Sequence, residues 1–335
     1  MNVLTKSTSE IRDTLISILS SHFNKSDSEA LAEIFLDSEL DGVKSHGLAR
    51  FPRLINETRD GYIQPGKKPS LSKSFAGWET WDGHSGAGPL NALFCTQRAV
   101  EVAQQFGIAC VGLKNTNHWL RPGHYAKVAA LNGCAFIGWS NTMPNMRAHN
   151  ANKTSLGNSP ISIGLPTGDG SDNITFVDLA LSQFSYGKMK AYVDSETTLP
   201  VDGGYDDQNN PTSDPNIIMK NQSASAIGYW KGSALSIILD MLAVLLSGGS
   251  SVFEIGQKPG EQDLSQVFIA IALDKLWDNE EYARRLTELK QQLKMIDPSV
   301  HIPSEKRLER RQGYVENGIS LPADLWQEIL DLNVQ

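Results

Sequence analysis

The stretch from residue 108 to 141 constrains the fold more than any other, because its hydrophobic period changes twice. The apolar run IACVGLKN leads into the polar loop TNHWLRPG, then a helical pattern, HYAKVAALNG, and a second apolar run, CAFIGWSN. This strand–loop–helix–strand order is typical of a sheet covered by helices. Three more strand-like runs occur downstream: PISIGLP, ITFVDLAL and QVFIAIAL. The residues therefore predict an α/β or α+β core.

Helix signals flank this core on both sides. Ser7 with Glu10, and Ser26 with Glu29, form capping boxes that predict two N-terminal helices. Further helices are expected from 48, from 89 to 107, from 231, from 279 to 296 and from 304 onward.

Composition limits the classes of partner. The chain has 335 residues, 40% hydrophobic and 20% charged, which is typical of a globular protein of about two domains. Its net charge of −8 offers no basic surface for nucleic acid. The N-terminus lacks the order of a signal peptide. The apolar run SALSIILDMLAVLL is shorter than the roughly 20 residues of a membrane span and contains Asp240. We expect a cytoplasmic protein, with this run as a buried helix and no membrane partner.

Common cofactor and metal motifs are missing. GHSGAG (83–88) and GDGSDN (168–173) do not fit the glycine pattern of a Rossmann dinucleotide fold, and we interpret both as turns. The sequence has no Walker, H-E-x-x-H or G-x-S-x-G motif, and its seven histidines show no metal-ligand spacing. We therefore predict no metal site.

Two histidines stand in polar loops, His46 in KSHGLAR and His118 in NTNHWLRPGH. A structural or surface role is the common alternative for a lone histidine. If the first segment is helical, however, Arg50 lies on the same face as His46, because residues four apart are neighbours. A guanidinium can hold a carboxylate in a bidentate pair while an imidazole reaches the adjacent oxygen. Such a pair suits a 2-keto acid.

Six segments together resemble one enzyme family. SHGLARFPR, NTNHWLRPG, GNSP, ITFVDLALSQFSYGKM, LPVDGGYDD and GYWKGSALSIILDML occur in the order and at the separations of the malate/L-lactate dehydrogenase family of type 2. The resemblance runs from about residue 10 to 330. It implies NAD(P)-dependent reduction of 2-oxo acids on a mixed α/β, non-Rossmann fold. It also implies a homodimer whose helical domain is built from both chain ends. The expected domains are 1–80, 81–284 for the cofactor and 285–335.

The resemblance also implies roles for individual residues. His46 matches the proton donor, whose ordinary pKa near 6.5 suits that task. Arg50 matches the clamp on the substrate carboxylate, and His118 lines the pocket beside the nicotinamide. The expected substrate contacts are Ser45, Arg50, Asn117, His118 and Arg121. The expected cofactor contacts are Ile174, Thr175, Phe176, Val177, Asp178, Leu179, Ala180, Trp230, Lys231, Ser304, Glu305 and Lys306.

Three departures from the family pattern bear on ligand choice. Ser304 replaces a glycine at the third cofactor contact, His124 replaces a serine, and MPNMRAHNANK (143–153) is an altered loop. A polar lining is expected from Asn117, His118, Arg121, His124, Asn141, Asn145 and Asn150. Such a lining fits a polyhydroxy acid, because unpaired buried polar groups are costly.

The sequence therefore predicts an oxidoreductase that reduces a sugar-derived 2-oxo acid. NADH is expected by resemblance, with NADP as the alternative cofactor. Malate, lactate, ureidoglycolate or a cyclic imino acid remain alternative substrates. A non-catalytic dimer that binds small carboxylates is the alternative from another class.

Overall fold

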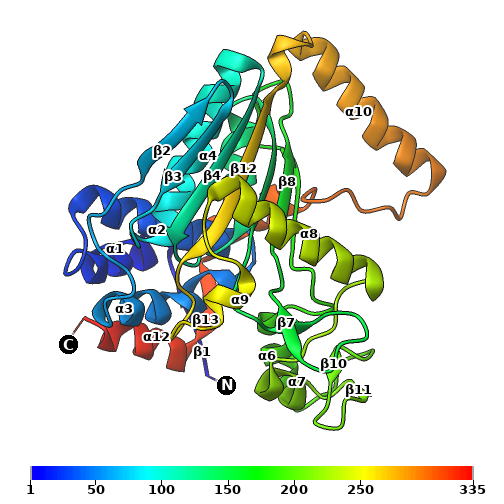
Figure 1. Cartoon of the computed structure of the whole chain (residues 1–335). Coiled ribbons are helices and arrows are strands. Elements are labelled where there is room, and N and C mark those ends of the chain that lie inside the picture. The colour runs from blue at the N-terminus through cyan, green and yellow to red at the C-terminus, as the bar shows by residue number, and fades with distance from the viewer. Residues whose placement is uncertain (1, 334–335) are drawn as a thin grey trace.

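A seven-stranded mixed sheet forms the centre of the computed structural model, which describes residues 2–333 (Figure 1). The strand order is β2-β3-β4-β12-β5-β8-β9. Only β3 and β4 pair in parallel, and the other neighbours are antiparallel. The strands are β2 (Ser70–Phe75), β3 (Trp78–Asp82), β4 (Ile108–Thr116), β5 (Cys134–Ser140), β8 (Ile161–Leu165), β9 (Thr175–Leu179) and β12 (Leu264–Ala272).

The predicted strand–loop–helix–strand unit is confirmed as β4, α5 (Pro122–Leu131) and β5. β12 lies between its two strands and runs antiparallel to both. Successive side chains of β12 point to opposite faces of the sheet. Phe268 packs in a core with α4 (Gly88–Phe106) and α5, whereas Val267 packs with α8 (Trp230–Ser247) on the opposite face. The mixed α/β class is therefore confirmed.

The helical part is built from both chain ends, as predicted. α1 (Thr8–Leu19), α2 (Lys25–Leu40) and α3 (Phe51–Arg59) share one core with α12 (Ala323–Asp331). β1 (Val3–Lys6) pairs antiparallel with β13 (Ile319–Pro322). α2 begins before the capping box predicted at Ser26. Its N-cap is Asn24, whose side-chain oxygen accepts a hydrogen bond from the backbone N–H of Asp27.

A smaller lobe packs below the sheet in Figure 1. Its elements are β6 (Met146–Arg147), β7 (Thr154–Leu156), α6 (Tyr186–Asp194), β10 (Gly204–Tyr205), β11 (Pro211–Thr212) and α7 (Pro215–Asn221). It shares a core with α8, in which Met146, Met189 and Ile218 are fully buried. The predicted domain limits stay predictions; residue 80 falls within β3 and residue 284 within α10 (Asn279–Ile296).

α8 (Trp230–Ser247) corrects one expectation. It is long and apolar enough to cross a membrane by length and composition, and a third of it, 33%, is buried. Leu239 and Ala243 pack on the sheet, so the helix is docked on the protein. Its other face is exposed at Leu235, Ile238, Met241, Leu242 and Leu245. The prediction of a fully buried helix is therefore wrong for the single chain.

The remaining helices are α9 (Val252–Ile255), α10 and α11 (Arg307–Asn317). α10 projects away from the body of the protein at the end of β12 (Figure 1). An ion pair between Lys294 of α10 and Glu305, at 2.7 Å, joins it to the segment that precedes α11.

Candidate active site

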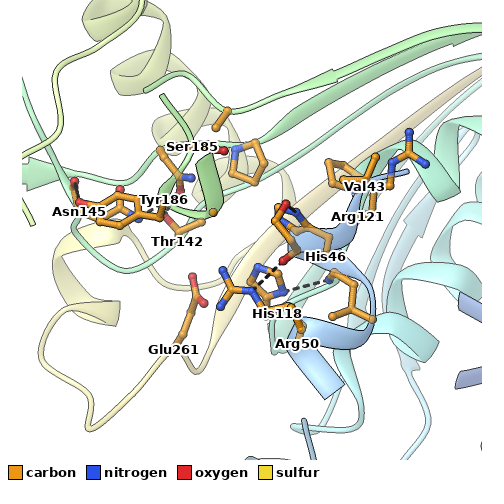
Figure 2. A pocket seen from close by; sticks show the side chains of 18 of the residues that line it. Val43, His46, Arg50, His118, Arg121, Thr142, Asn145, Ser185, Tyr186 and Glu261 are labelled. Atoms are coloured by element: carbon orange, nitrogen blue, oxygen red, sulfur yellow. Dashed lines mark hydrogen bonds between the residues drawn. The ribbon is translucent and has the colours of Figure 1, made fainter. Parts of the chain in front are cut away.

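A cavity of about 650 Å³ lies between the helical part, the ends of the central strands and the smaller lobe. Figure 2 shows its two sides. His46, Arg50 and His118 form one side, and Thr142, Asn145 and Tyr186 form the other. Ser45, Arg121 and Asp178 also line it. The structure thus brings together predicted catalytic residues, His46 and His118, that are 72 positions apart in the chain.

Two short 3₁₀ turns carry His46 and Arg50. These are η1 (Lys44–His46) and η2 (Leu48–Arg50), joined by Gly47. The continuous helix that was expected from residue 48 is therefore wrong at its start, and α3 begins only at residue 51. His46 is the last residue of η1 and Arg50 the last residue of η2, and both side chains line the cavity.

Glu39 of α2 holds these two turns in place. Its carboxylate is buried and accepts a hydrogen bond from the backbone N–H of Leu48 at 2.7 Å. A Cβ on Gly47 would lie 2.3 Å from Oε1 of Glu39, so only glycine leaves room for the carboxylate. Burial raises the pKa of Glu39 to about 7. Sequence reasoning missed this residue, because a glutamate inside a helical pattern gives no sign that it faces inward.

His46 is less basic than an exposed histidine. Burial lowers its pKa to about 4, and the positive charge of Arg50 acts in the same direction. The expectation of an ordinary pKa near 6.5 is therefore wrong for His46 in this structure. The Nδ1 atom of His46 lies 3.0 Å from the hydroxyl of Ser45, which fixes the plane of the ring.

His118 has a defined tautomer. The backbone N–H of Leu120 donates to its Nδ1 at 3.0 Å, so a neutral ring carries its proton on Nε2. Burial holds the pKa of His118 well below its usual value, which keeps the ring neutral near pH 7. His118 therefore offers a hydrogen-bond donor to the cavity.

Among the arginine and lysine side chains that line the cavity, Arg50 alone has no ion-pair partner in the described residues. Its Nε donates to the backbone carbonyl of Ser45 at 3.3 Å, and no carboxylate pairs with it among residues 2–333. Burial lowers its pKa, as does the nearby Arg53. Arg121, in contrast, is held by two carboxylates, Asp41 and Asp178.

The polar lining differs from the expected one. Of the seven side chains expected there, His118, Arg121 and Asn145 line the cavity. Asn117 lies outside the lining and donates to the carbonyls of Ser85 and Gly86. His124 contacts Asp37 at 2.8 Å, and Asn141 bonds to Asp240.

The expectation is therefore wrong for four of the seven. Asn150 is exposed outside the lining. The side chains of Asn117, His124 and Asn141 bond to other residues instead. A sequence pattern places these residues in loops near the site but does not show which way each side chain turns. The cavity also contains residues that were not among the expected contacts: Thr142, Asn158, Tyr186 and Glu261. Asn158 and Tyr186 lie in GNSP and ITFVDLALSQFSYGKM, two of the segments that carry the family resemblance.

One predicted cofactor segment forms β9, an edge strand of the sheet, and the segment around Ser304 contacts it. The hydroxyl of Ser304 donates to the carbonyl of Ile174 at 2.7 Å and accepts from the N–H of Phe176 at 3.2 Å. Beyond the other end of β9, the carbonyl of Leu181 accepts from the N–H of Ile227 at 2.8 Å, shortly before α8 begins.

The side chains of these segments differ in their surroundings. Ile174 and Phe176 are buried, whereas Thr175 and Val177 are partly or well exposed. Asp178, Leu179 and Ala180 line the cavity. Trp230, Lys231 and Lys306 are exposed. The hydrogen bond from Lys294 lowers the pKa of Glu305 to about 2.

Comparisons with known proteins agree with this architecture. The sequence profile described as malate/L-lactate dehydrogenase matches residues 7–330. The 2,3-diketo-L-gulonate reductase of Pasteurella multocida is 37% identical over 310 residues, which cover 91% of this chain and 92% of that protein. The protein of the same name from Citrobacter koseri is 38% identical over 307 residues, 90% of this chain and 91% of that one.

Solved structures show the same fold. A malate dehydrogenase from Entamoeba histolytica has a TM-score of 0.92 at 23% identity, covering 99% of this chain and 98% of its own. A Δ1-piperideine-2-carboxylate reductase from Pseudomonas syringae has a TM-score of 0.89 at 25% identity, covering 98% and 99%. With a family profile that spans nearly the whole sequence and relatives at this level of identity, the chain belongs to the malate/L-lactate dehydrogenase family of oxidoreductases.

Proposed function

We propose that this oxidoreductase converts a 2-oxo acid to the 2-hydroxy acid with NADH. The observation that carries the proposal is the cavity in which His46 and Arg50 meet, with Arg50 free of carboxylate partners among the described residues. A guanidinium of this kind binds a substrate carboxylate in a planar, two-point contact. The keto oxygen next to that carboxylate then lies within reach of His46.

The residues around β9 fit a nicotinamide cofactor, which is the cofactor type of a dehydrogenase family. An edge strand offers backbone amides and carbonyls to a ligand. Lys231 stands exposed in the first turn of α8, where its cation suits a phosphate. When bound, the cofactor supplies a hydride, with its two electrons, to the keto carbon. We propose NADH rather than NADPH on the family resemblance.

Side chains of the protein then supply the proton that completes the reduction. His46 enters as the imidazolium and transfers its proton to the developing alkoxide, and it later regains a proton from solvent. A bound carboxylate neutralises Arg50, and this raises the pKa of His46 from its value of about 4 in the empty cavity. His118 donates through Nε2 and holds the substrate oxygen in line, which stabilises the growing negative charge.

The proposed substrate is 2,3-diketo-L-gulonate or a closely related sugar-derived oxo acid. Two relatives at 37% and 38% identity carry the name of that activity. The cavity supports the proposal, because polar side chains of Thr142, Asn145 and Tyr186 stand opposite Arg50 and can pair with hydroxyl groups. Malate, lactate, ureidoglycolate and cyclic imino acids are the competing substrates.

We propose a homodimer in the cytoplasm as the working form. The exposed apolar face of α8 supports a dimer, because an apolar stripe of this size is usually covered by a partner. Leu245 and Met241 are 74% and 56% exposed in the single chain.

Side-by-side kinetics test the proposal. The protein is incubated with NADH or NADPH and with 2,3-diketo-L-gulonate, pyruvate, oxaloacetate or Δ1-piperideine-2-carboxylate, and the nicotinamide absorbance is followed. We expect the highest kcat/KM with NADH and the sugar acid. A higher value for another acid contradicts the substrate, and a preference for NADPH contradicts the cofactor. Binding of acids without any turnover would favour the non-catalytic alternative.

A further inference from the structure

The charges that line the cavity are almost fully paired inside the protein. Arg53 contacts Glu57 at 2.6 Å and Glu261 at 3.0 Å. Arg121, which is buried, contacts Asp41 and Asp178, whereas Lys190 contacts Asp194 in a solvent-exposed pair. Arg50 is thus the one arginine or lysine of this lining without a carboxylate partner within residues 2–333. The burial of His46 and His118 keeps both rings neutral near pH 7 in the empty cavity.

This arrangement leaves one positive charge for the ligand. A substrate with a single carboxylate pairs with Arg50. A second carboxylate would find Arg53 and Arg121 already paired, and a buried anion without a partner is strongly disfavoured.

Glu261 makes the cavity actively unfavourable for a second anion. It lies in the loop before β12 and is 8% exposed. Its carboxylate lines the cavity and lies close enough to Arg50 to affect its pKa. Figure 2 shows Glu261 on the same side of the cavity as the guanidinium of Arg50. Like charges in a site shielded from water repel strongly.

The opposite wall offers only neutral partners near its centre. Thr142 and Asn145 both donate to Oδ1 of Asn158, at 3.1 and 3.2 Å. The side-chain Oδ1 of Asn145 is buried and has no hydrogen-bond partner in the described chain. Neutral amide and hydroxyl groups give a second carboxylate no opposite charge to pair with.

We propose that Glu261 determines specificity by charge, so that the site accepts 2-oxo acids with one carboxylate and a neutral tail and rejects 2-oxo dicarboxylates. This inference rests on the proposed function and adds to it the charge class of the substrate. Selection of this kind works by an unfavourable contact with the wrong ligand rather than by an added contact with the right one.

Two acids of equal chain length test the proposal. Their difference is one carboxylate: 2-oxopentanoate has a methyl end and 2-oxoglutarate a second carboxylate. The readout is the ratio of kcat/KM for 2-oxopentanoate to kcat/KM for 2-oxoglutarate. We expect the wild-type ratio to be well above one. In Glu261→Gln the repulsion is lost, and we expect the ratio to fall by about tenfold.

Two further variants separate the charge of Glu261 from its contact with Arg53. Glu57→Gln breaks the other ion pair of Arg53 without changing the lining, because Glu57 is not part of it. Glu261→Asp keeps the charge. We expect both variants to retain the wild-type ratio. An equal fall in Glu57→Gln and Glu261→Gln would mean that Glu261 acts only by holding Arg53, and this overturns the proposal.

The wild-type measurement decides the matter even if a variant fails to fold. A wild-type protein that reduces 2-oxoglutarate as well as 2-oxopentanoate overturns charge selection and leaves the proposed function standing. An unchanged ratio in a folded Glu261→Gln overturns it too. A wild-type protein that reduces no 2-oxo acid with either cofactor overturns both proposals.

Discussion

The rings of His46 and His118 lie almost parallel in the cavity, with 6.0 Å between their centroids and 19° between their planes. They come from separate parts of the chain, a 3₁₀ turn of the helical part and the loop after β4. Ser45 contacts Nδ1 of His46, and the backbone of Leu120 contacts Nδ1 of His118. Both rings therefore keep Nε2 for the ligand, and two roles can be assigned and tested separately.

The first prediction concerns proton transfer. Glutamine at position 46 keeps polarity and approximate size but removes the titrating proton. We expect His46→Gln to lower kcat for reduction by about 10² to 10⁴, the usual contribution of a general acid. The Kd for NADH, measured by fluorescence, should stay within a few-fold of wild type. A variant of nearly normal activity would indicate that His118 is the donor.

The second prediction concerns the carboxylate clamp. Arg50→Lys keeps the charge but loses the planar, two-point contact. We expect KM for the oxo acid to rise by about tenfold or more while kcat changes less, because binding is lost before chemistry begins. Arg59→Lys, at the end of α3 and outside the lining, serves as the matched control. An unchanged KM in Arg50→Lys would show that the carboxylate binds elsewhere.

The third prediction concerns pH. Reduction needs the protonated form of His46, whose pKa in the empty cavity is about 4. We expect kcat/KM for reduction to fall as the pH rises above that value, by about tenfold per unit. The inflection in kcat should lie at higher pH, because the bound substrate neutralises Arg50. Initial rates from about pH 3 to 8, within the range in which the protein stays folded, measure both profiles. Equal inflections in kcat and kcat/KM would contradict this coupling.

The fourth prediction concerns stability. The pKa of Glu39 is about 7 in the folded protein against a model value of 4.5. Between these values the folded state holds a proton that the unfolded chain releases, so stability falls as the pH rises. Glu39→Gln does not titrate and still offers an oxygen to Leu48. Its free energy of unfolding, relative to wild type, should therefore increase by about 1 kcal/mol per pH unit between pH 5 and 7.

Glu79, whose pKa is lowered rather than raised, is the control for this measurement. Hydrogen bonds from Arg98 lower the pKa of Glu79, so its ionised form is favoured in the folded state. Glu79→Gln should destabilise the protein at neutral pH, where Glu79 is ionised. Denaturant titrations at several pH values measure both variants. A difference for Glu39→Gln that does not change with pH would mean that Glu39 is not a proton-binding group of the folded protein.

The fifth prediction concerns assembly. Leu245 on the exposed face of α8 is 74% exposed, and Phe75 on β2 is 81% exposed. A charge at position 245 would lie within the proposed dimer interface. We expect Leu245→Lys to be monomeric in sedimentation velocity and Phe75→Lys to remain dimeric. Dimers of equal affinity in both variants would place the interface away from this face.

The strands and helices with a clear period could be predicted from the sequence. The runs at β4, β5, β8, β9 and β12 form strands, and α10 spans the residues expected of it. His46 and Arg50 also share a cavity as expected. Here the local pattern and the tertiary environment favour the same structure.

The parts that could not be predicted depend on tertiary contacts. The break at Gly47 depends on Glu39, which stands on another helix. His124 turns to Asp37 because a buried carboxylate is there to receive it, and a loop pattern carries no information on that partner. The low pKa of His46 depends on burial and on the charge of Arg50. The free face of α8 cannot be told from a buried one by hydrophobicity alone.

The pairing of β1 with β13 has a consequence for how the protein is made. Val3 pairs with Pro322 and Lys6 with Ile319, so β1 can pair only after β13 has been synthesised. The hydroxyl of Ser304 likewise reaches β9 only after the whole sheet has been synthesised. A nascent chain that stops before residue 304 therefore lacks both of these contacts. This edge of the sheet is therefore completed only after residue 304 has been synthesised, and shorter products leave the backbone of β9 open for chaperones to recognise.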